Sequence, residues 1–474
     1  MRSSPDSPIT NHVGRGRTLV VLGPVSLAIV GIAVATSDRP LAVTFILGTA
    51  VVVGATVLGV RHFGFLTLLM IGGRTAIDLA HPGVDEEALR LSVLITGLYT
   101  LISVVWLILR RFAQRPVRIS PIGIAVVVVT AAATLSGLLS EDRITALIGA
   151  SRWVFLTVFV VVLDNLLIDQ RAVRRLLLAI GASTIVPIGF GIWQLMEGRG
   201  RLIDGISRIE GSFAHPNTYG FYLAVIGLAL IAVSPGLPNF QKFVARALLL
   251  MVIASLVLTY SRTSYAAFAV GVVVIAIVGR RWLLLGITLA TIAVAPMLPG
   301  VGARLADLGE GATLRGTPGN SLTWRLDYWQ TVVEVGEGRR ATGVGLGVVS
   351  ELTDSGREPH NDFVRSFVEL GAIGLAAYLG FLAVMGSQVY AALMRTRSRS
   401  EDRGLPRCLA EGFAGIFAAY LIESVTGNPM TQLILLSYVV ALALAACQSG
   451  RHVAVAAVRR DNNDMGRRPE PIRG

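Results

Sequence analysis

The chain contains few charged residues, few cysteines and a single lysine, Lys242. Only 15% of its 474 residues are charged and 53% are hydrophobic, whereas soluble globular chains contain about 25% charged residues. This composition excludes an ordinary soluble domain and indicates one large helical membrane domain. The two cysteines, Cys408 and Cys447, lie in apolar stretches. We therefore expect core packing from them, and no disulfide framework.

Two further absences argue against particular classes of function. No His, Cys, Asp or Glu spacing typical of a metal site occurs, so we expect no metal and no cofactor. No internal repeat and no matching pair of broken helices, which mark many secondary transporters, can be found. The net charge of +12 does not predict nucleic-acid binding, because the basic residues lie in short runs between apolar segments and form no basic domain.

Apolar segments recur at roughly the 20-residue length that a helix needs to cross the hydrocarbon core. They predict an all-α, polytopic membrane protein of about 12–14 transmembrane helices. The predicted spans are roughly 18–36, 40–60, 63–80, 91–109, 120–139, 147–167, 175–196, 217–235, 243–260, 264–279, 282–299, 363–388, 408–426 and 430–448. The segments 63–80 and 264–299 are the least regular of these. Residues 1–17 are polar and predict a disordered cytoplasmic tail, and the first span lacks a cleavage pattern and is expected to be retained.

The arginine-rich connections predict the orientation. With a cytoplasmic N-terminus and alternating spans, the basic runs near residues 110–118, 171–175, 280–281 and 395–407 all fall inside, as the positive-inside rule requires. We therefore predict a multi-pass protein of the cell membrane with both termini in the cytoplasm. The loops 197–216, 261–263 and 301–362 then share one extracytoplasmic surface, and 301–362 is the one long hydrophilic loop.

Arg262 lies in a short turn between two apolar segments, at their predicted outer boundary. It can be an interfacial arginine that snorkels to water, flanked by Tyr260 and Tyr265. It can also be a phosphate ligand, because a guanidinium binds phosphate oxygens bidentately. Position alone does not separate these two roles.

The stretch Asn320–Gln330 predicts a short amphipathic helix at the outer membrane–water boundary. Trp324, Tyr328 and Trp329 are then interface anchors, or they stack on sugar rings. Arg325 is either a solvated charge or a second cation directed at the anion that Arg262 binds. The pattern does not decide between these roles.

His360 gives the strongest local signal. Pro359 disfavours helix before it, and Asn361 or Asp362 can cap the span that follows. The imidazole is therefore expected at the positive end of a membrane helix, which favours its neutral form. A neutral imidazole suits the removal of a proton from an acceptor hydroxyl, and the alternative is an ordinary loop histidine.

His215 repeats this arrangement at the start of another span, and it is expected to line the same pocket, with helix capping by Asn217 as the alternative. The expected substrate-binding residues are His215, Asn217, Tyr260, Trp324, Tyr328, Arg357 and Asn361.

Glycines and one charge pair predict local structure only. Gly343, Gly345 and Gly347 follow no predicted strand, so they indicate a tight turn and no dinucleotide loop. Arg365 and Glu369 have the i,i+4 spacing of an ion pair. Gly371 and Gly374 have the pattern of helix-packing positions.

Several motifs, in this order, resemble those of the O-antigen ligase and polymerase superfamily of bacterial membrane glycosyltransferases. They are Ser-Phe-Ala-His-Pro-Asn at 212–217, Tyr-Ser-Arg-Thr-Ser at 260–264, Trp-Arg at 324–325, Gly-Val-Gly-Leu-Gly at 343–347, and Pro-His-Asn-Asp-Phe at 359–363 followed by Glu-Leu-Gly-Ala-Ile-Gly at 369–374. The resemblance covers roughly residues 205–390. We expect N-terminal transmembrane helices at 18–200, a ligase-like catalytic membrane region at 201–448 and a basic cytoplasmic tail at 449–474.

The resemblance implies a glycosyltransferase that takes a glycan from a polyprenyl-pyrophosphate carrier and passes it to a glycan or glycolipid acceptor. Its partners would be these substrates and membrane lipids, with no nucleotide sugar, metal or nucleic acid. By motif, Arg262 and Arg325 would neutralise the leaving pyrophosphate, and His360 would be the general base toward the acceptor hydroxyl. Two arginines would then do the electrostatic work that a metal does elsewhere.

Two other functions stay open at this level. A secondary transporter or lipid-linked oligosaccharide flippase needs ionisable residues at mid-membrane depth. The candidates lie near predicted span ends: Arg74, Asp78, Arg152 and Glu423. A peptidoglycan polymerase of the shape-and-division type would use the same class of donor.

Overall fold

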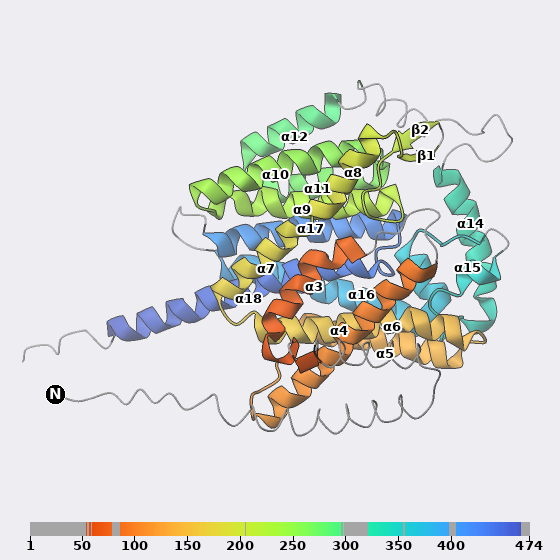
Figure 1. Cartoon of the computed structure of the whole chain (residues 1–474), viewed down its shortest axis with the longest axis horizontal. Coiled ribbons are helices and arrows are strands. Elements are labelled where there is room, and N and C mark those ends of the chain that lie inside the picture. Colours follow the sequence, from red (N-terminus) through yellow and green to blue (C-terminus); the bar gives the residue numbers. More distant parts are fainter. Residues whose placement is uncertain are drawn as a thin grey trace, which may run out of the picture. The chain divides into compact units, whose positions relative to one another are not determined.

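A computed structural model describes residues 54–77 except 55 and 58, 86–294 except 204, 297, 321–353, 356–397 and 404–465. Within these residues the protein is an all-α polytopic membrane protein (Figure 1). Nine of the described helices are long and apolar enough to cross a membrane, and three shorter apolar helices accompany them. Every predicted span from residue 63 onward corresponds to one of these helices. The predicted tail 1–17, span 18–36 and most of span 40–60 lie outside the described residues.

The chain forms two compact units, one of residues 1–67 and 94–117 and the other of 68–93 and 118–474. In the first unit, the start of α3 (Phe63–Ile77) contacts α4 (Glu86–Phe112). Phe63 stacks on Trp106 with ring centroids 4.4 Å apart, and the Tyr99 hydroxyl donates to Thr67 Oγ1 over 3.3 Å.

The second unit contains the remaining elements. They are α5 (Pro121–Leu139), α6 (Arg143–Leu166), α7 (Gln170–Ala182), α8 (Ile185–Met196), β1 (Arg201–Ile203), β2 (Ile206–Arg208), α9 (Pro216–Val233), η1 (Ser234–Gly236), α10 (Asn239–Leu258), α11 (Arg262–Val278), α12 (Trp282–Val294), α14 (Ser321–Val335), η4 (Glu337–Arg339), α15 (Val349–Leu352), α16 (Asp362–Arg395), α17 (Leu405–Thr426) and α18 (Leu433–Met465). Helix α9 is apolar and buried along nearly its whole length, as expected for a central helix. It packs against α10, α11 and α17.

Polar contacts define two ends of the second unit. At one end, Arg281 precedes α12 and pairs with Glu411 near the start of α17 at 2.6 Å. Its guanidinium also donates to the carbonyl oxygens of Ile231 and Ala232 at the end of α9. The start of α9 therefore lies at the opposite end, where the starts of α11, α16 and α18 also meet. The loops 197–216 and 261–263 and the described part of 301–362 thus lie at one end, and the side of the membrane that it faces stays a prediction.

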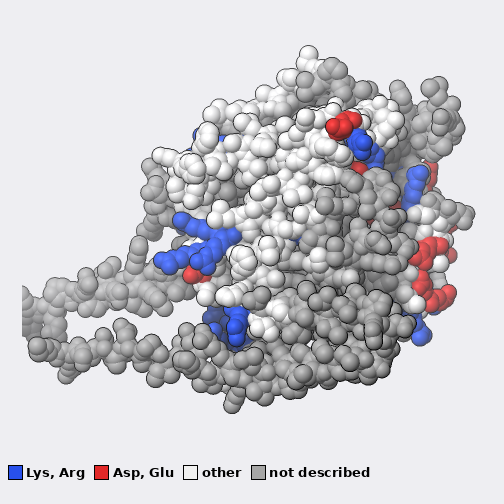
Figure 2. Space-filling model, in the orientation of Figure 1, with Lys and Arg blue, Asp and Glu red and all other residues white. Residues whose placement is uncertain are grey.

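Acidic side chains lie on the surface around α14 and α15, on the right in Figure 2. The exposed carboxylates of this region include those of Glu141, Asp327, Glu334, Glu337 and Glu351.

Helix α16 is interrupted at Gly371, where φ is 71° and ψ is −173°. The backbone groups beside the break are paired with the loop that follows η4. Val344 N donates to Val368 O over 3.0 Å, and Ala372 N donates to Arg340 O over 2.8 Å. Backbone groups at membrane depth must be satisfied within the protein, so this loop completes the helix.

Glycine makes this close approach possible. A Cβ atom on Gly343 would lie 2.3 Å from the backbone of Glu369, and one on Gly371 would lie 2.3 Å from the backbone of Ala341. Gly343, Gly345 and Gly347 all have positive φ, which confirms the predicted turn. Gly371 is a point where the helix breaks, so its interpretation as an ordinary packing position was wrong.

The short antiparallel hairpin β1–β2 pairs Arg201 with Arg208. The sequence pattern does not predict these strands. The hairpin precedes α9 and brings Arg208 to the site described next.

Candidate functional site

His360 lies where the loop before α16 meets the loop between α17 and α18. Its φ of 51° is unusual for a residue other than glycine. Its Nδ1 atom lies 3.1 Å from Nδ2 of Asn428, and the same Nδ2 atom donates to Glu358 Oε2 over 2.6 Å. The next residue, Asn361, caps α16 by accepting from the backbone N–H groups of residues 363 and 364, as the sequence predicted.

The imidazole of His360 is neutral at neutral pH. Burial lowers its pKa to about 4, and the positive charge of Arg325 is the second cause. The sequence also indicated a neutral imidazole, but for another reason, the dipole of the following helix. Removal from water is the larger effect, because it disfavours the charged form of any titratable group.

Arg325 on α14 lies within electrostatic range of two other predicted catalytic residues. Burial lowers the pKa of its guanidinium, Glu423 raises it, and the positive charge of Arg262 lowers it again. Arg325 in turn lowers the pKa of His360. The fold thus brings Arg262, Arg325 and His360 into one electrostatic cluster, and their catalytic roles stay predictions.

Helix α14 confirms the short helix predicted around Asn320–Gln330. The Trp329 indole donates from Nε1 to the carbonyl oxygen of Pro359 over 2.6 Å. Tyr328 is only 6% exposed, and its hydroxyl bonds to Thr353 Oγ1 at 2.9 Å and to the carbonyl oxygen of Arg357. Tyr328 is therefore a packed residue that holds the loop before His360. The side chain of Trp324 lies outside the described residues, and that of Arg357 is exposed.

His215 itself caps α9, since its Nδ1 atom accepts from the N–H of Asn217 over 3.1 Å. Capping by Asn217 was the alternative interpretation, but its Oδ1 accepts from Arg208 Nη2 over 2.6 Å. Arg208 also donates from Nε to the carbonyl oxygen of Thr259 over 2.7 Å. Burial lowers the pKa of His215 to about 4, followed by the charges of Arg208, Arg201 and His360. Because the charge of His360 affects the pKa of His215, His215 lies near the cluster of Arg262, Arg325 and His360.

Tyr260 turns the chain from α10 into α11. Its φ of 48° is that of a left-handed residue after a helix end. The turn brings Ser261 Oγ within 2.8 Å of Ser264 Oγ, and Ser264 Oγ lies 3.4 Å from the carbonyl oxygen of Asn217. The motifs at 212–217 and 260–264 are thus in direct contact.

Arg365 is buried, with 1% exposure, between two carboxylates. It lies 3.4 Å from Glu369 Oε2 and 3.2 Å from Glu358 Oε2. The pair with Glu369 confirms the i,i+4 prediction, and the contact with Glu358 was not predicted. Glu369 Oε2 also accepts from Gly347 N over 2.9 Å, so this ion pair joins α16 to the glycine turn.

Two buried carboxylates beside the cluster were missed as site residues. Asp362 accepts from the Tyr378 hydroxyl over 2.8 Å and from Met430 N over 3.1 Å. One oxygen of Asp362 and one of Glu423 have no hydrogen-bond partner among the described residues. Acidic residues inside otherwise apolar spans were the available signal, but Asp362 was interpreted as a cap and Glu423 as a transport candidate. Among the described residues, no three side chains of His, Cys, Asp or Glu are grouped to hold a metal.

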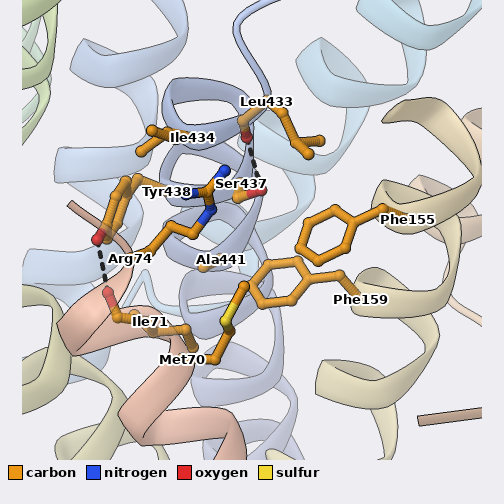
Figure 3. A pocket seen from close by; sticks show the side chains of 10 residues that line it. All are labelled: Met70, Ile71, Arg74, Phe155, Phe159, Leu433, Ile434, Ser437, Tyr438 and Ala441. Atoms are coloured by element: carbon orange, nitrogen blue, oxygen red, sulfur yellow. Dashed lines mark hydrogen bonds between the residues drawn. The ribbon is translucent and has the colours of Figure 1, made fainter. Parts of the chain in front are cut away.

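A separate pocket lies between α3, α6 and α18 (Figure 3). Met70, Phe155 and Phe159 make much of its lining apolar. The Arg74 guanidinium points toward Ser437 and Tyr438, and the Tyr438 hydroxyl donates to Ile71 O over 2.6 Å. Of the other transport candidates, Arg152 bonds to the carbonyl oxygen of Thr431 at 3.4 Å, and Asp78 lies outside the described residues.

Comparison with known families supports the resemblance drawn from the motifs. Residues 247–379 match the family model described as O-antigen ligase. The matched stretch runs from α10 into α16 and contains Arg262, Arg325 and His360, whereas His215 precedes it. None of the curated proteins matches the chain significantly. The match supports an O-antigen ligase- or polymerase-type membrane enzyme of polysaccharide assembly.

Proposed function

We propose that the protein transfers a glycan from a polyprenyl-pyrophosphate carrier to an acceptor hydroxyl on the outer side of the cell membrane. The observation that carries this proposal is the cluster of Arg262, Arg325 and His360. These residues come from three separate segments, all within the stretch that matches the O-antigen ligase model.

The two arginines are the proposed ligands of the pyrophosphate. Their positive charges repel each other, and the charge of Arg262 lowers the pKa of Arg325. A bound pyrophosphate relieves this repulsion and accepts hydrogen bonds from both guanidiniums. Because negative charge grows on the leaving pyrophosphate as the glycosidic bond breaks, two fixed cations stabilise the transition state more than the ground state.

His360 is the proposed general base. The acceptor oxygen attacks the anomeric carbon with inversion, its proton passes to the imidazole, and the bond between the anomeric carbon and the phosphate oxygen breaks. An imidazole with a pKa of about 4 is a weak base. A bound pyrophosphate raises this pKa, because a nearby anion favours the imidazolium.

The decisive experiment is reconstitution in proteoliposomes with defined lipid-pyrophosphate donors. We expect glycan transfer between two lipids, and loss of transfer in Arg262→Ala, Arg325→Ala and His360→Ala proteins that still insert. Full activity in all three variants would rule the proposal out. A lipid-linked disaccharide-pentapeptide donor in the same assay tests the peptidoglycan polymerase alternative.

A secondary transporter or flippase is the second candidate. Its support is the buried Glu423, whose carboxylate interacts with Arg325 inside a membrane-embedded unit. It predicts movement of lipid-linked oligosaccharide or solute that depends on an ion gradient, without transfer between lipids. The same proteoliposomes, with and without a proton gradient, separate the two functions.

A further inference from the structure

Asn428 uses both protons of its side-chain amide. One proton points to Glu358 Oε2 at 2.6 Å and the other to His360 Nδ1 at 3.1 Å. A carboxylate only accepts hydrogen bonds, so the atom of Asn428 that faces Glu358 is the nitrogen. The chemistry of Glu358 therefore determines the orientation of the Asn428 amide.

The orientation of Asn428 determines which nitrogen of His360 carries the proton. A neutral imidazole has one N–H donor and one acceptor nitrogen. Because Nδ1 faces an amide donor, Nδ1 is the acceptor and Nε2 carries the hydrogen. Nε2 is the ring nitrogen left for a ligand, and in this tautomer it donates a hydrogen bond and has no lone pair to take up a proton.

We infer that Glu358 and Asn428 are positioning residues that keep the proton of neutral His360 on Nε2, and that His360 takes a proton through Nε2 only after Asn428 turns its carbonyl oxygen to Nδ1. The second half of this statement rests on the proposed function. In that turned state Nδ1–H donates to Asn428 Oδ1, and the lone pair lies on Nε2. The histidine of a catalytic triad is held in its working tautomer by a similar acceptor.

Two features make the turn of Asn428 possible. Its Oδ1 atom is buried and has no hydrogen-bond partner among the described residues, so the turn gives it one. Glu358 has a second partner within reach, the Arg365 cation, because its Oε2 atom lies 3.2 Å from Nη2 of Arg365. The Glu358 side chain is also 47% exposed, so it can move toward Arg365 or water without opening the core.

Nitrogen-15 NMR of histidine-labelled protein in lipid nanodiscs, at pH 7 and without substrate, measures the tautomer directly. The chain has six histidines, and the difference from His360→Gln assigns the signal. We expect a pyridine-like Nδ1 and a pyrrole-like Nε2. The opposite tautomer, or an equal mixture of the two, overturns the inference.

Substitutions of Glu358 and Asn428 test whether these two residues determine the tautomer of His360. Asn428→Asp replaces the amide donor by an acceptor, so we expect the hydrogen to move to Nδ1. In Glu358→Gln, the side chain at position 358 no longer determines which end of the Asn428 amide faces it. We therefore expect both tautomers of His360. The control is Thr431→Val, because Thr431 Oγ1 donates to the backbone oxygen of Asn428 over 3.1 Å and its loss disturbs the loop alone. An unchanged tautomer in Asn428→Asp and Glu358→Gln contradicts the inference.

Measurements of turnover test the second part of the inference, in which Asn428 turns before His360 takes up a proton. Asn428→Leu has no acceptor for Nδ1–H, so we expect kcat to fall by about 10²-fold or more, with KM for the donor little changed. Asn428→Asp should keep kcat within about 10-fold of the wild type, since its carboxylate supports the base-competent tautomer. Equal losses of kcat in Asn428→Leu and Asn428→Asp would overturn this second part of the inference. If the wild type transfers no glycan, the proposed function fails, whereas the NMR result stands on its own.

Discussion

Trp329 on α14 and Pro359, the residue before His360, are joined by a hydrogen bond of 2.6 Å from the indole Nε1 to the carbonyl oxygen. The bond connects the helix that carries Arg325 to the loop that carries His360. The Trp329 indole therefore helps to set the distance between the Arg325 cation and the imidazole. Without this bond, the loop is held on the α14 side mainly by Tyr328.

We expect Trp329→Phe to reduce the rate of transfer by about 10- to 100-fold, because a displacement of about 1 Å at a reacting group has an effect of this size. Stability should change by only about 1 kcal/mol, the net contribution of one hydrogen bond. The rate is measured in proteoliposomes and the stability by thermal unfolding. The control is Trp282→Phe, which changes a 66% exposed indole on α12. An unchanged rate in Trp329→Phe would show that the loop keeps its place without the indole.

Arg325→Gln should lower the transfer rate by about 10²- to 10³-fold, as removal of one stabilising donor does in other enzymes. Arg325→Lys should recover part of the rate, because it restores the charge without the planar fork. The matched control is Arg340→Gln, whose side chain is 65% exposed and pairs with Glu337 on the surface. A larger loss in the control than in Arg325→Gln would contradict a role in binding the leaving group.

Stability should fall as the pH decreases from about 6.5 to about 4. His215 and His360 each have a pKa of about 4 in the folded protein against 6.5 as the ordinary value. In this range the unfolded chain binds protons that the folded protein does not bind. Protonation therefore lowers the free energy of the unfolded state, and the free energy of unfolding decreases. Thermal unfolding between pH 4 and pH 7 measures the slope, and replacement of both histidines by glutamine should flatten it. An unchanged slope in that double variant would contradict the prediction.

Gly371→Ala should prevent α16 from closing against the loop after η4. The added Cβ atom would lie 2.3 Å from the carbonyl carbon and oxygen of Ala341, at a φ of 71° that alanine disfavours. We expect poor accumulation of folded protein, measured by size-exclusion chromatography of a fluorescent fusion. Gly380→Ala in the same helix is the control, because its Cβ atom would meet nothing within 4 Å. That change should be neutral or stabilise the helix by about 1 kcal/mol.

Arg365→Met should destabilise the protein by about 3–5 kcal/mol, because it leaves Glu369 buried without its cation. Both side chains are 1% exposed, so water cannot replace the lost charge. The double variant Arg365→Met, Glu369→Leu should recover much of this loss, since it removes the second charge as well. Unfolding in SDS, followed by circular dichroism, measures both. Equal losses in the single and double variants would show that packing and the contact with Glu358 matter more than the pair.

The helices were predictable because the bilayer imposes their length on the sequence. Arg262 and His360 were also predictable as candidates, since polar residues at span ends stand out against an apolar background, and Arg325 was predictable from the amphipathic helix in the long loop. The sequence pattern did not decide between a structural and a catalytic interpretation. The structure adds that Arg325 interacts electrostatically with both Arg262 and His360.

Other features depend on contacts between distant segments. Glycine is common in membrane helices, so Gly371 gave no sign of a break that the loop after η4 completes. Arg208 belongs to a hairpin of two three-residue strands, too short for a periodic signal, and its partners are Asn217 and Thr259. Tyr328 was predicted as an interface anchor or a sugar-stacking residue, whereas in the fold it belongs to a buried cluster with Val344 and Val348.

The break in α16 also bears on how the protein is made. The ribosome synthesises residues 340–345 before it reaches Gly371. The loop that pairs with the break in α16 has therefore been synthesised when this part of α16 enters the bilayer. A circular permutant that begins at α16 would reverse this order. Its carbonyl oxygens around Gly371 would face lipid until the last part of the chain had been synthesised, a state that hydrocarbon strongly disfavours.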